Sequence, residues 1–221
     1  MKTHRIIFIF LSLMMAFSIT AQTVDEAKQP VVNWGLKLQA NASNIVLHNV
    51  YQDLHSIMNV GGEVGAFIDF NISKHFFIQF NWIGFAEHTD LVNNDLHDRL
   101  WTLGIEIPVY AMARFGNAQS GYVYFGGGPF TEFSLRGFMD GDTGKMDPYR
   151  HVVGVDEQGD EQFAMSDNHS GLGVYLGYEL PCGLQFNASY QHSISDILAF
   201  AHSTAMSARP QKVIVGIGWR F

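Results

Sequence analysis

Apolar and polar residues alternate with a period of two over much of this chain, and that period is typical of a β-strand whose two faces meet different surroundings. Every odd-numbered position from 213 to 221 is apolar, and so is every even-numbered position from 184 to 190. The segments 34–43 and 76–87 repeat the pattern, although three aromatic or aliphatic residues interrupt the polar face of the second. The chain is therefore predicted to consist of alternating strands.

Four further segments follow the same pattern with more exceptions, which brings the predicted number of strands to eight. In chain order the segments are 34–43, 64–70, 76–87, 101–115, 122–136, 172–180, 184–191 and 212–221. Most are about 9 to 15 residues long, whereas soluble strands average about 5 to 6 residues and a strand that crosses a bilayer needs about 9 to 11. The lengths favour membrane-spanning strands.

The connections between these segments alternate between short and long. The short ones are 71–75, 116–120 and 181–183, and the long ones are 48–60, 89–99, 137–167 and 196–210. Short periplasmic turns and long external loops are typical of an up-and-down barrel of the outer membrane. The predicted fold class is therefore all-β: an eight-stranded antiparallel transmembrane β-barrel with both termini in the periplasm.

The charged residues of the strands share one face, and this indicates which face points into the barrel. They are Lys37, Glu63, Asp69, Glu106, Arg114, Glu132, Arg136, Glu179 and Arg220. A lumen of eight strands is just wide enough to be filled by side chains, and a buried charge there needs a partner. The arginines Arg114, Arg136 and Arg220 are expected to pair with the glutamates Glu106, Glu132 and Glu179. The alternative is a soluble lipocalin-like binding barrel, in which the apolar face would point inward.

The four tryptophans are predicted to face lipid. Trp34, Trp82, Trp101 and Trp219 all fall on the apolar face. Tryptophans near strand ends suit the aromatic girdles that flank the apolar band of an outer-membrane barrel. The sequence therefore predicts outer-membrane lipid as a partner of the outward surface.

The N-terminus reads as an export signal. Lys2 and Arg5 precede an apolar stretch, and the small residue Ala21 offers a cleavage site. The predicted domains are a signal peptide over 1–21, a short periplasmic lead over 22–32 and the barrel over 33–221.

The amino-acid composition argues against some classes of protein. Only 15% of the residues are charged, and the net charge of −8 argues against a nucleic-acid partner, which needs a basic patch. Cys182 is the single cysteine, so no disulfide framework is expected.

Several short segments together resemble the PorT-like outer-membrane β-barrel family of Bacteroidetes. They are Gly61–Phe67, Leu103–Pro108, Phe125–Pro129, Leu176–Leu180, Tyr190–Ile197 and Gly216–Phe221. The resemblance implies an outer-membrane barrel whose last strand, ending at Phe221, is recognised by the barrel-assembly machinery. It implies no single activity, and a link to secretion would extend the role of the family's namesake. The long acidic loop 137–167 departs from the resemblance.

Two groups of loop residues offer candidate metal ligands. Eight histidines fall in or near the long loops: His48, His55, His88, His97, His151, His169, His192 and His202. Imidazoles bind zinc or copper, but no pair has the helical spacing of a known zinc motif. The run Asp140–Gly144, with Asp147, Asp156, Asp160 and Glu161, offers oxygen ligands for calcium but lacks the EF-hand pattern. No metal or cofactor is predicted.

An enzymatic alternative rests on the end of the seventh strand. His192, Ser193 and Ser195 lie beside Asp196 and could form a lipid-modifying site at the rim. Adjacent residues of a strand point to opposite faces, which separates His192 from Ser193. The sequence therefore predicts a non-enzymatic barrel with a structural or binding role through its external loops, for an extracellular or periplasmic partner that the sequence does not identify; the alternative is a lipid-modifying barrel enzyme.

Overall fold

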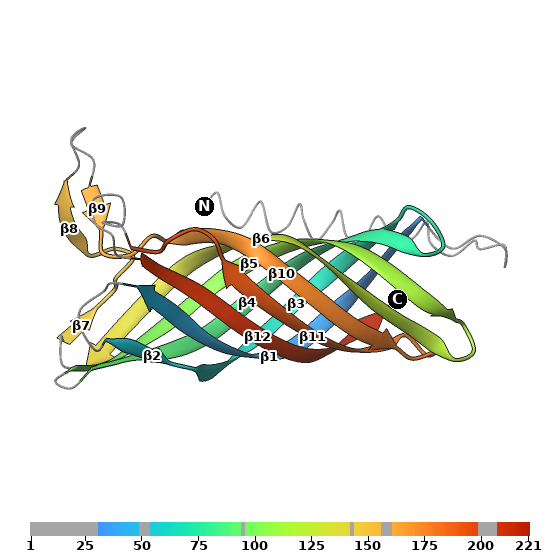
Figure 1. Ribbon diagram of the computed structural model, residues 1–221, viewed down its shortest axis with the longest axis horizontal. Coiled ribbons are helices and arrows are strands. Elements are labelled where there is room, and N and C mark those ends of the chain that lie inside the picture. Colours follow the sequence, from blue (N-terminus) through green and yellow to red (C-terminus); the bar gives the residue numbers. More distant parts are fainter. Residues whose placement is uncertain (1–30, 49–53, 94–95, 142–143, 156–160, 199–206) are drawn as a thin grey trace, which may run out of the picture.

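The computed structural model describes residues 31–48, 54–93, 96–141, 144–155, 161–198 and 207–221. Eight long strands form the wall (Figure 1): β1 (Val32–His48), β3 (Asn59–Asn71), β4 (Phe76–Asn93), β5 (Leu96–Asn117), β6 (Gly121–Gly141), β10 (Asn168–Glu179), β11 (Leu184–Ser193) and β12 (Ser207–Arg220). Four short strands lie outside this set: β2 (His55–Ile57), β7 (Gly144–Met146), β8 (Val152–Val155) and β9 (Glu161–Phe163). No helix of the described residues is long and apolar enough to cross a membrane.

The eight strands form a closed ring. Each pairs antiparallel with the next, and the ring closes where β12 pairs with β1. On the far side β6 pairs with β10 over twelve residues, from Asn168 opposite Phe133 to Glu179 opposite Tyr122. A closed ring gives every strand two neighbours, so no edge of backbone groups is left without partners in the hydrocarbon.

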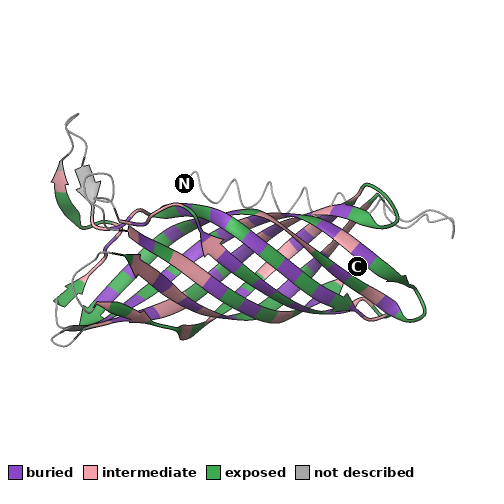
Figure 2. Cartoon of the chain, viewed as in Figure 1, coloured by how far each residue is buried: buried purple, intermediate pink, exposed green. Residues whose placement is uncertain are grey.

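Burial alternates along each strand, as Figure 2 shows, and the polar side is the buried one. In β11, for example, Gln185, Asn187 and Ser189 are buried, whereas Phe186 and Tyr190 are exposed. All four tryptophans lie on the outward side. The inside-out arrangement excludes the lipocalin-like alternative, because a soluble barrel would bury its apolar side.

The three short turns are confirmed. They join β3 to β4, β5 to β6 and β10 to β11. Glycines allow the tight bends: Gly121 at the start of β6 and Gly183 before β11 have φ angles of +91° and +88°, which other residues rarely adopt.

The predicted long connection over 89–99 is wrong. β4 continues to Asn93 and β5 begins at Leu96, so the two strands form an extended hairpin in which Asp90 lies opposite Arg99. Charged residues interrupt the apolar alternation here, but the antiparallel ladder continues through them. β5 and β6 consequently reach 22 and 21 residues, longer than a bilayer requires.

A β-bulge changes the direction of one predicted lumen residue. The register between β5 and β6 shifts at this point, because Leu103 lies opposite Arg136 while Gly104 lies opposite Ser134. Leu135 and Arg136 are therefore both exposed on the outside. The prediction that Arg136 faces the lumen is wrong, because a bulge inserts one residue and shifts the alternation beyond it.

Residues 1–30 lie outside the described residues, so the signal peptide remains a prediction. The barrel itself begins at Val32, one residue before the expected boundary.

Candidate functional site: the lumen and the outer mouth

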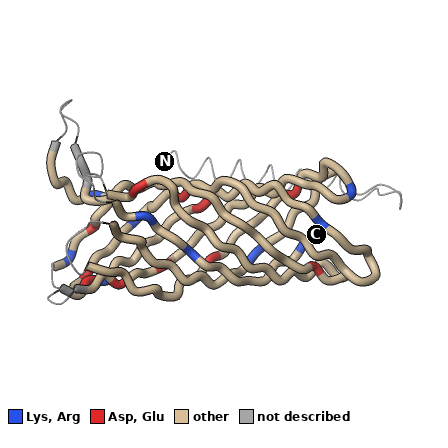
Figure 3. Tube along the Cα trace, viewed as in Figure 1, with Lys and Arg blue, Asp and Glu red and all other residues tan. Residues whose placement is uncertain are grey.

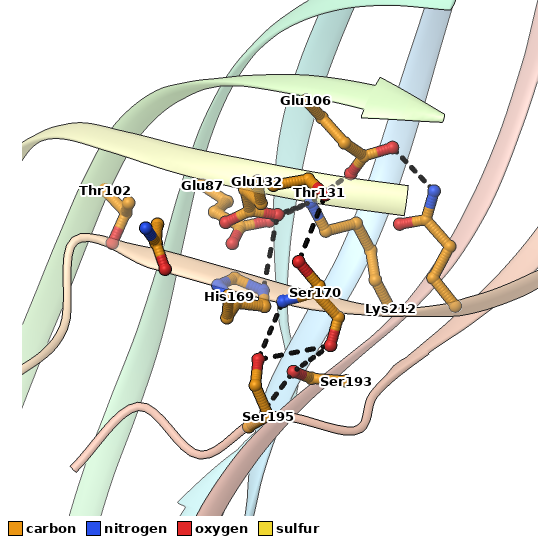
Figure 4. Close-up of polar contacts among 12 residues, drawn as sticks. Glu87, Thr102, Glu106, Thr131, Glu132, His169, Ser170, Ser193, Ser195 and Lys212 are labelled. Carbon is orange, nitrogen blue, oxygen red and sulfur yellow. Dashed lines mark hydrogen bonds and ion pairs between the residues drawn. The ribbon is translucent and has the colours of Figure 1, made fainter. Parts of the chain in front are cut away.

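One lysine crosses the lumen to four glutamates, and Figure 4 shows it with three of them, Glu87, Glu106 and Glu132. Glu63, Glu87, Glu106 and Glu132 come from the four consecutive strands β3, β4, β5 and β6. The Nζ atom of Lys212, on β12, lies 3.8, 3.3, 3.2 and 2.9 Å from their carboxylate oxygens in that order. Lys212 is 4% exposed, so this group of five charged residues, called here the lysine–glutamate cluster, is buried.

Polar side chains surround the lysine–glutamate cluster. The amide of Gln191 donates to Glu106 at 2.6 Å and to the hydroxyl of Tyr110 at 3.0 Å. The amide of Asn41 donates to Glu63 at 2.7 Å. Buried charges are tolerated only when such partners satisfy their remaining hydrogen-bonding groups, so these amides help to hold the cluster together.

Two ion pairs predicted from the sequence are wrong. Glu106 and Glu132 were expected to pair with arginines, but both pair with Lys212. The alternation places Lys212 on the polar face of its strand, yet a pattern along one strand does not reveal which side chain meets it from the opposite wall. His169, buried with its Nε2 atom 3.8 Å from Glu132, also belongs to this part of the lumen rather than to a loop.

A second charge network lies toward the periplasmic end. Arg220, also on β12, lies 2.8 Å from Asp69 and 3.1 Å from Glu179. The predicted pair between Arg220 and Glu179 is therefore confirmed. Lys37 donates to Gln79 at 2.8 Å and lies over the ring of Tyr175, 4.5 Å from its centroid.

Arg114 contacts the turn between β3 and β4 at the periplasmic end. Its guanidinium donates to the side-chain oxygen of Asn71 at 3.1 Å and to the backbone carbonyl of Lys74 at 3.2 Å. It also lies over the rings of Phe77 and Tyr122, at 5.5 Å from each centroid. Arg114 thus braces the periplasmic turn, because this end of β5 lies far along the barrel from Glu106 and Glu132.

Aromatic residues fill the space between the two networks. Phe77, Tyr110, Met112, Tyr124 and Tyr175 form a buried cluster. A side chain on Gly177 would place its Cβ 2.3 Å from the ring of Tyr124, so a glycine makes room for the tyrosine. Two of the cavities in the described lumen measure about 10 and 30 Å³, and the larger has room for about two water molecules. Figure 3 shows charges of both signs spaced along this filled barrel.

An apolar cluster closes the outer mouth. Its buried members are Ile45, Leu91, Leu100, Met139, Met165, Ile197 and Ala208, drawn from the wall and from the loops. The loop residue Tyr149 packs against this cluster, and its hydroxyl lies 3.1 Å from that of Thr102. Burial raises the pKa of Tyr149 to about 12, so its phenol stays neutral at pH 7. We call this group the mouth cluster; it packs loop residues against the wall at the outer end of the lumen.

The histidines considered as metal ligands are dispersed. His88 stacks on Trp101 with ring centroids 4.4 Å apart, whereas His169 lies in the lumen and His151 is exposed in a loop. No three His, Cys, Asp or Glu residues among those described are arranged to hold a metal ion. His202 lies outside the described residues.

The described carboxylates of the acidic loop have structural roles. Asp140 lies 3.6 Å from Lys145, and Asp147 accepts a hydrogen bond from the backbone of Tyr149 at 3.1 Å. Asp142, Asp156 and Asp160 lie outside the described residues, and the side chain of Glu161 is not described.

The serines at the end of β11 bond to backbone rather than to histidine. Figure 4 shows the hydroxyls of Ser193 and Ser195, which each donate to the carbonyl of Ser170 at 3.2 Å. The carboxylate of Asp196 accepts hydrogen bonds from the backbone of Leu198 at 2.9 Å and of Ala208 at 3.1 Å. These contacts fasten the base of the loop between β11 and β12.

The fold and the lumen together define a class: a closed, eight-stranded transmembrane barrel with a lipid-facing apolar exterior. The chain belongs to the family described as the outer membrane protein beta-barrel domain, which it matches over residues 9–221. It is accordingly a protein of the cell outer membrane.

Similar structures have been solved for proteins of low sequence identity. OprG from Pseudomonas aeruginosa is 13% identical, with a TM-score of 0.48 over 89% of this chain and 99% of that one. Ail from Yersinia pestis, in complex with the heparin analogue sucrose octasulfate, is 10% identical, with a TM-score of 0.45 over 87% and 100%. Neisserial surface protein A is 13% identical, with a TM-score of 0.44 over 85% and 97%. No curated protein matches the sequence.

Proposed function

We propose that the protein is a closed, non-enzymatic barrel that presents its external loops to a binding partner outside the cell. The observation that carries this proposal is the packing of the outer end, where loop residue Tyr149 lies against the mouth cluster above a lumen occupied by buried polar and aromatic side chains. A barrel filled in this way offers no route for diffusion of solutes. The parts that extend beyond the bilayer are the long hairpins and loops, so these are the surfaces available for binding.

The β8–β9 hairpin is the best-exposed candidate for contact with a partner. It forms a two-stranded sheet separate from the barrel wall, and Val152 and Val153 are exposed on it. Figure 1 shows the hairpin standing clear of the barrel end. Exposed apolar residues beyond the membrane favour contact with a protein partner.

The resemblance to the PorT-like family belongs to this proposal as well. It suggests a secretion component as one kind of partner and assembly through the terminal strand ending at Phe221. The enzymatic alternative is less favoured, because the hydroxyls of Ser193 and Ser195 bond to a backbone carbonyl rather than to an imidazole.

The test compares adhesion of cells to surfaces coated with extracellular-matrix protein. A strain that carries the chain should adhere, a deletion strain should not, and the double variant Val152→Asn/Val153→Asn should lose most of the adhesion. Lys74→Gln, in a periplasmic turn, is the matched control and should adhere normally. Equal adhesion by the deletion strain would contradict the binding role, and a changed lipid A mass spectrum in that strain would favour the enzyme.

A further inference from the structure

The bulge in β6 places a single arginine on the outside of the barrel. Arg136 and the preceding Leu135 both point outward, and Leu103 lies opposite on β5. No ion pair joins Arg136 to a carboxylate of the described residues. Bulges often serve to re-aim a side chain, so this outward direction calls for a partner outside the protein.

The height of Arg136 along the barrel matches the boundary of the outer leaflet. Phe125, exposed near the periplasmic end of β6, stacks on the exposed Phe115 with ring centroids 5.9 Å apart, and we take this pair as the lower edge of the apolar band, where aromatic girdles lie. Arg136 follows on the same strand after about ten regular steps, since the bulge adds little rise. At about 3.3 Å per residue and a strand tilt of about 40°, this is about 25 Å above Phe125. The apolar band of such barrels is also about 25 Å tall, so Arg136 lies at the level of lipid headgroups.

The surroundings of Arg136 combine apolar surface with a second cation. Trp101 lies opposite Phe138, and their side chains are 45% and 47% exposed. The amine of Lys145 lies 6.0 Å from the centroid of the Phe138 ring and 3.6 Å from Asp140. Arg136 and Phe138 share the outward face two residues apart, so the two cations flank one aromatic ring.

We propose that Arg136, Lys145 and the aromatic surface between them bind a phosphate group of a lipid in the outer leaflet. Guanidinium groups bind phosphate with two parallel hydrogen bonds, which are stronger than bonds between neutral groups. The exposed side chains of Leu103, opposite Arg136, and Leu135, one residue nearer the membrane, would contact the acyl region, whereas Trp101 and Phe138 lie on the outer side of Arg136. The site depends on the lipid-facing wall and is independent of any partner of the loops.

The test is native mass spectrometry of the detergent-solubilised protein. The probe is phosphorylated lipid A, and dephosphorylated lipid A is its comparison. The wild type should bind the phosphorylated form at least tenfold more tightly. Arg136→Gln should lose about tenfold in affinity for that form, and Arg136→Gln/Lys145→Gln should lose the preference entirely. The matched control is Arg209→Gln, an exposed residue near the outer end of β12, which should bind like the wild type.

Four results would overturn the proposal. Three are equal binding of the two lipids, unchanged binding by the double variant, and an equal loss in Arg209→Gln. The fourth is displacement of the lipid by millimolar inorganic phosphate, because it would indicate a small-anion site rather than a lipid site. A shift in gel mobility on heating, measured for every variant, establishes that the barrel is folded.

Discussion

At the scale of single residues, Lys212 has the most consequential position in the barrel. It is the cation that all four glutamates of the lysine–glutamate cluster share, at 2.9 to 3.8 Å. Removal of one partner from a buried ion pair leaves the other charge without compensation, which costs about 3–5 kcal/mol. The stability of the barrel therefore depends on this lysine more than on any exposed basic residue.

Lys212→Met should lower the free energy of unfolding by about 3–5 kcal/mol. Urea unfolding of the barrel in lipid vesicles, followed by tryptophan fluorescence, measures this. The triple variant Lys212→Met/Glu106→Gln/Glu132→Gln should regain part of the loss, because it removes two of the carboxylates left behind. Lys145→Met, at an exposed lysine, should change stability by less than about 0.5 kcal/mol. An equal loss in Lys145→Met would contradict the special role of Lys212.

Asp90, in the hairpin beyond the bilayer, should make a contribution to the stability of the barrel that depends on pH. Its carboxylate accepts a hydrogen bond from Arg99 at 2.9 Å. Partial burial acts to raise the pKa of Asp90, but hydrogen bonds from Arg99 and Asn59 and the charge of Arg99 outweigh it, so the pKa is lowered. The folded state thus favours the ionised form, and its contribution is present above the ordinary pKa of about 3.9 and lost as pH falls through the lowered value.

Asp90→Asn should therefore destabilise the barrel at pH 7 by about 0.5 kcal/mol, since Arg99 is half exposed to solvent. The difference from the wild type should disappear at a pH below the lowered pKa. Urea unfolding at both pH values measures it, with the exposed Asp167→Asn as control. A difference in unfolding free energy between Asp90→Asn and the wild type that grew as the pH fell would contradict the prediction.

At the scale of elements, the β6 bulge should tolerate a deletion that a regular strand does not. Deletion of Arg136 removes the extra residue, and Gly137 to Met139 keep their present directions. Deletion of Leu103, directly opposite, inverts Thr102, Trp101 and Leu100, because a slip of one residue moves each side chain to the other face.

The deletion of Arg136 should accordingly give a barrel that folds and shows heat-dependent gel mobility like the wild type. The deletion of Leu103 should reduce the folded fraction severalfold in the same gel assay. Equal folding yields for the two deletions would mean that the bulge does not make β6 more tolerant of a lost residue than a regular strand.

The sequence predicts the strands and the direction of most of their side chains, but it does not predict which side chains meet across the lumen. Alternation along β11 and β12 is strict, so the outward directions of Phe186 and Ile217 follow from the pattern alone. The outward direction of Arg136 does not follow from the pattern, because the alternation of apolar and polar residues along β6 shows no break at the bulge. The lysine–glutamate cluster escapes prediction for another reason: contacts between Lys212 and Glu106 depend on the register of eight strands, and one strand carries no information about the wall opposite.

At the scale of the whole molecule, the filled lumen predicts a barrel that does not conduct ions. Purified protein in planar bilayers should give no stepwise conductance. Gly137→Val should displace Tyr149, because a Cβ at position 137 would lie 2.5 Å from its ring. Loop 144–155 should then be cleaved faster by added protease, while conductance stays absent because the lysine–glutamate cluster still fills the lumen. Conductance in this variant would mean that the loop alone closes the barrel.

The placement of the buried cations has a consequence for the order of assembly. Lys212 and Arg220 both lie on β12, the last strand of the chain, whereas the carboxylates they contact lie on β3 to β6 and on β10. A partly inserted sheet that lacks β12 would hold its acidic side chains without these counter-charges and would keep them hydrated. The pairing of β12 with β1 and β11 therefore closes the ring and, in the same step, brings these two cations to the acidic side chains of the interior.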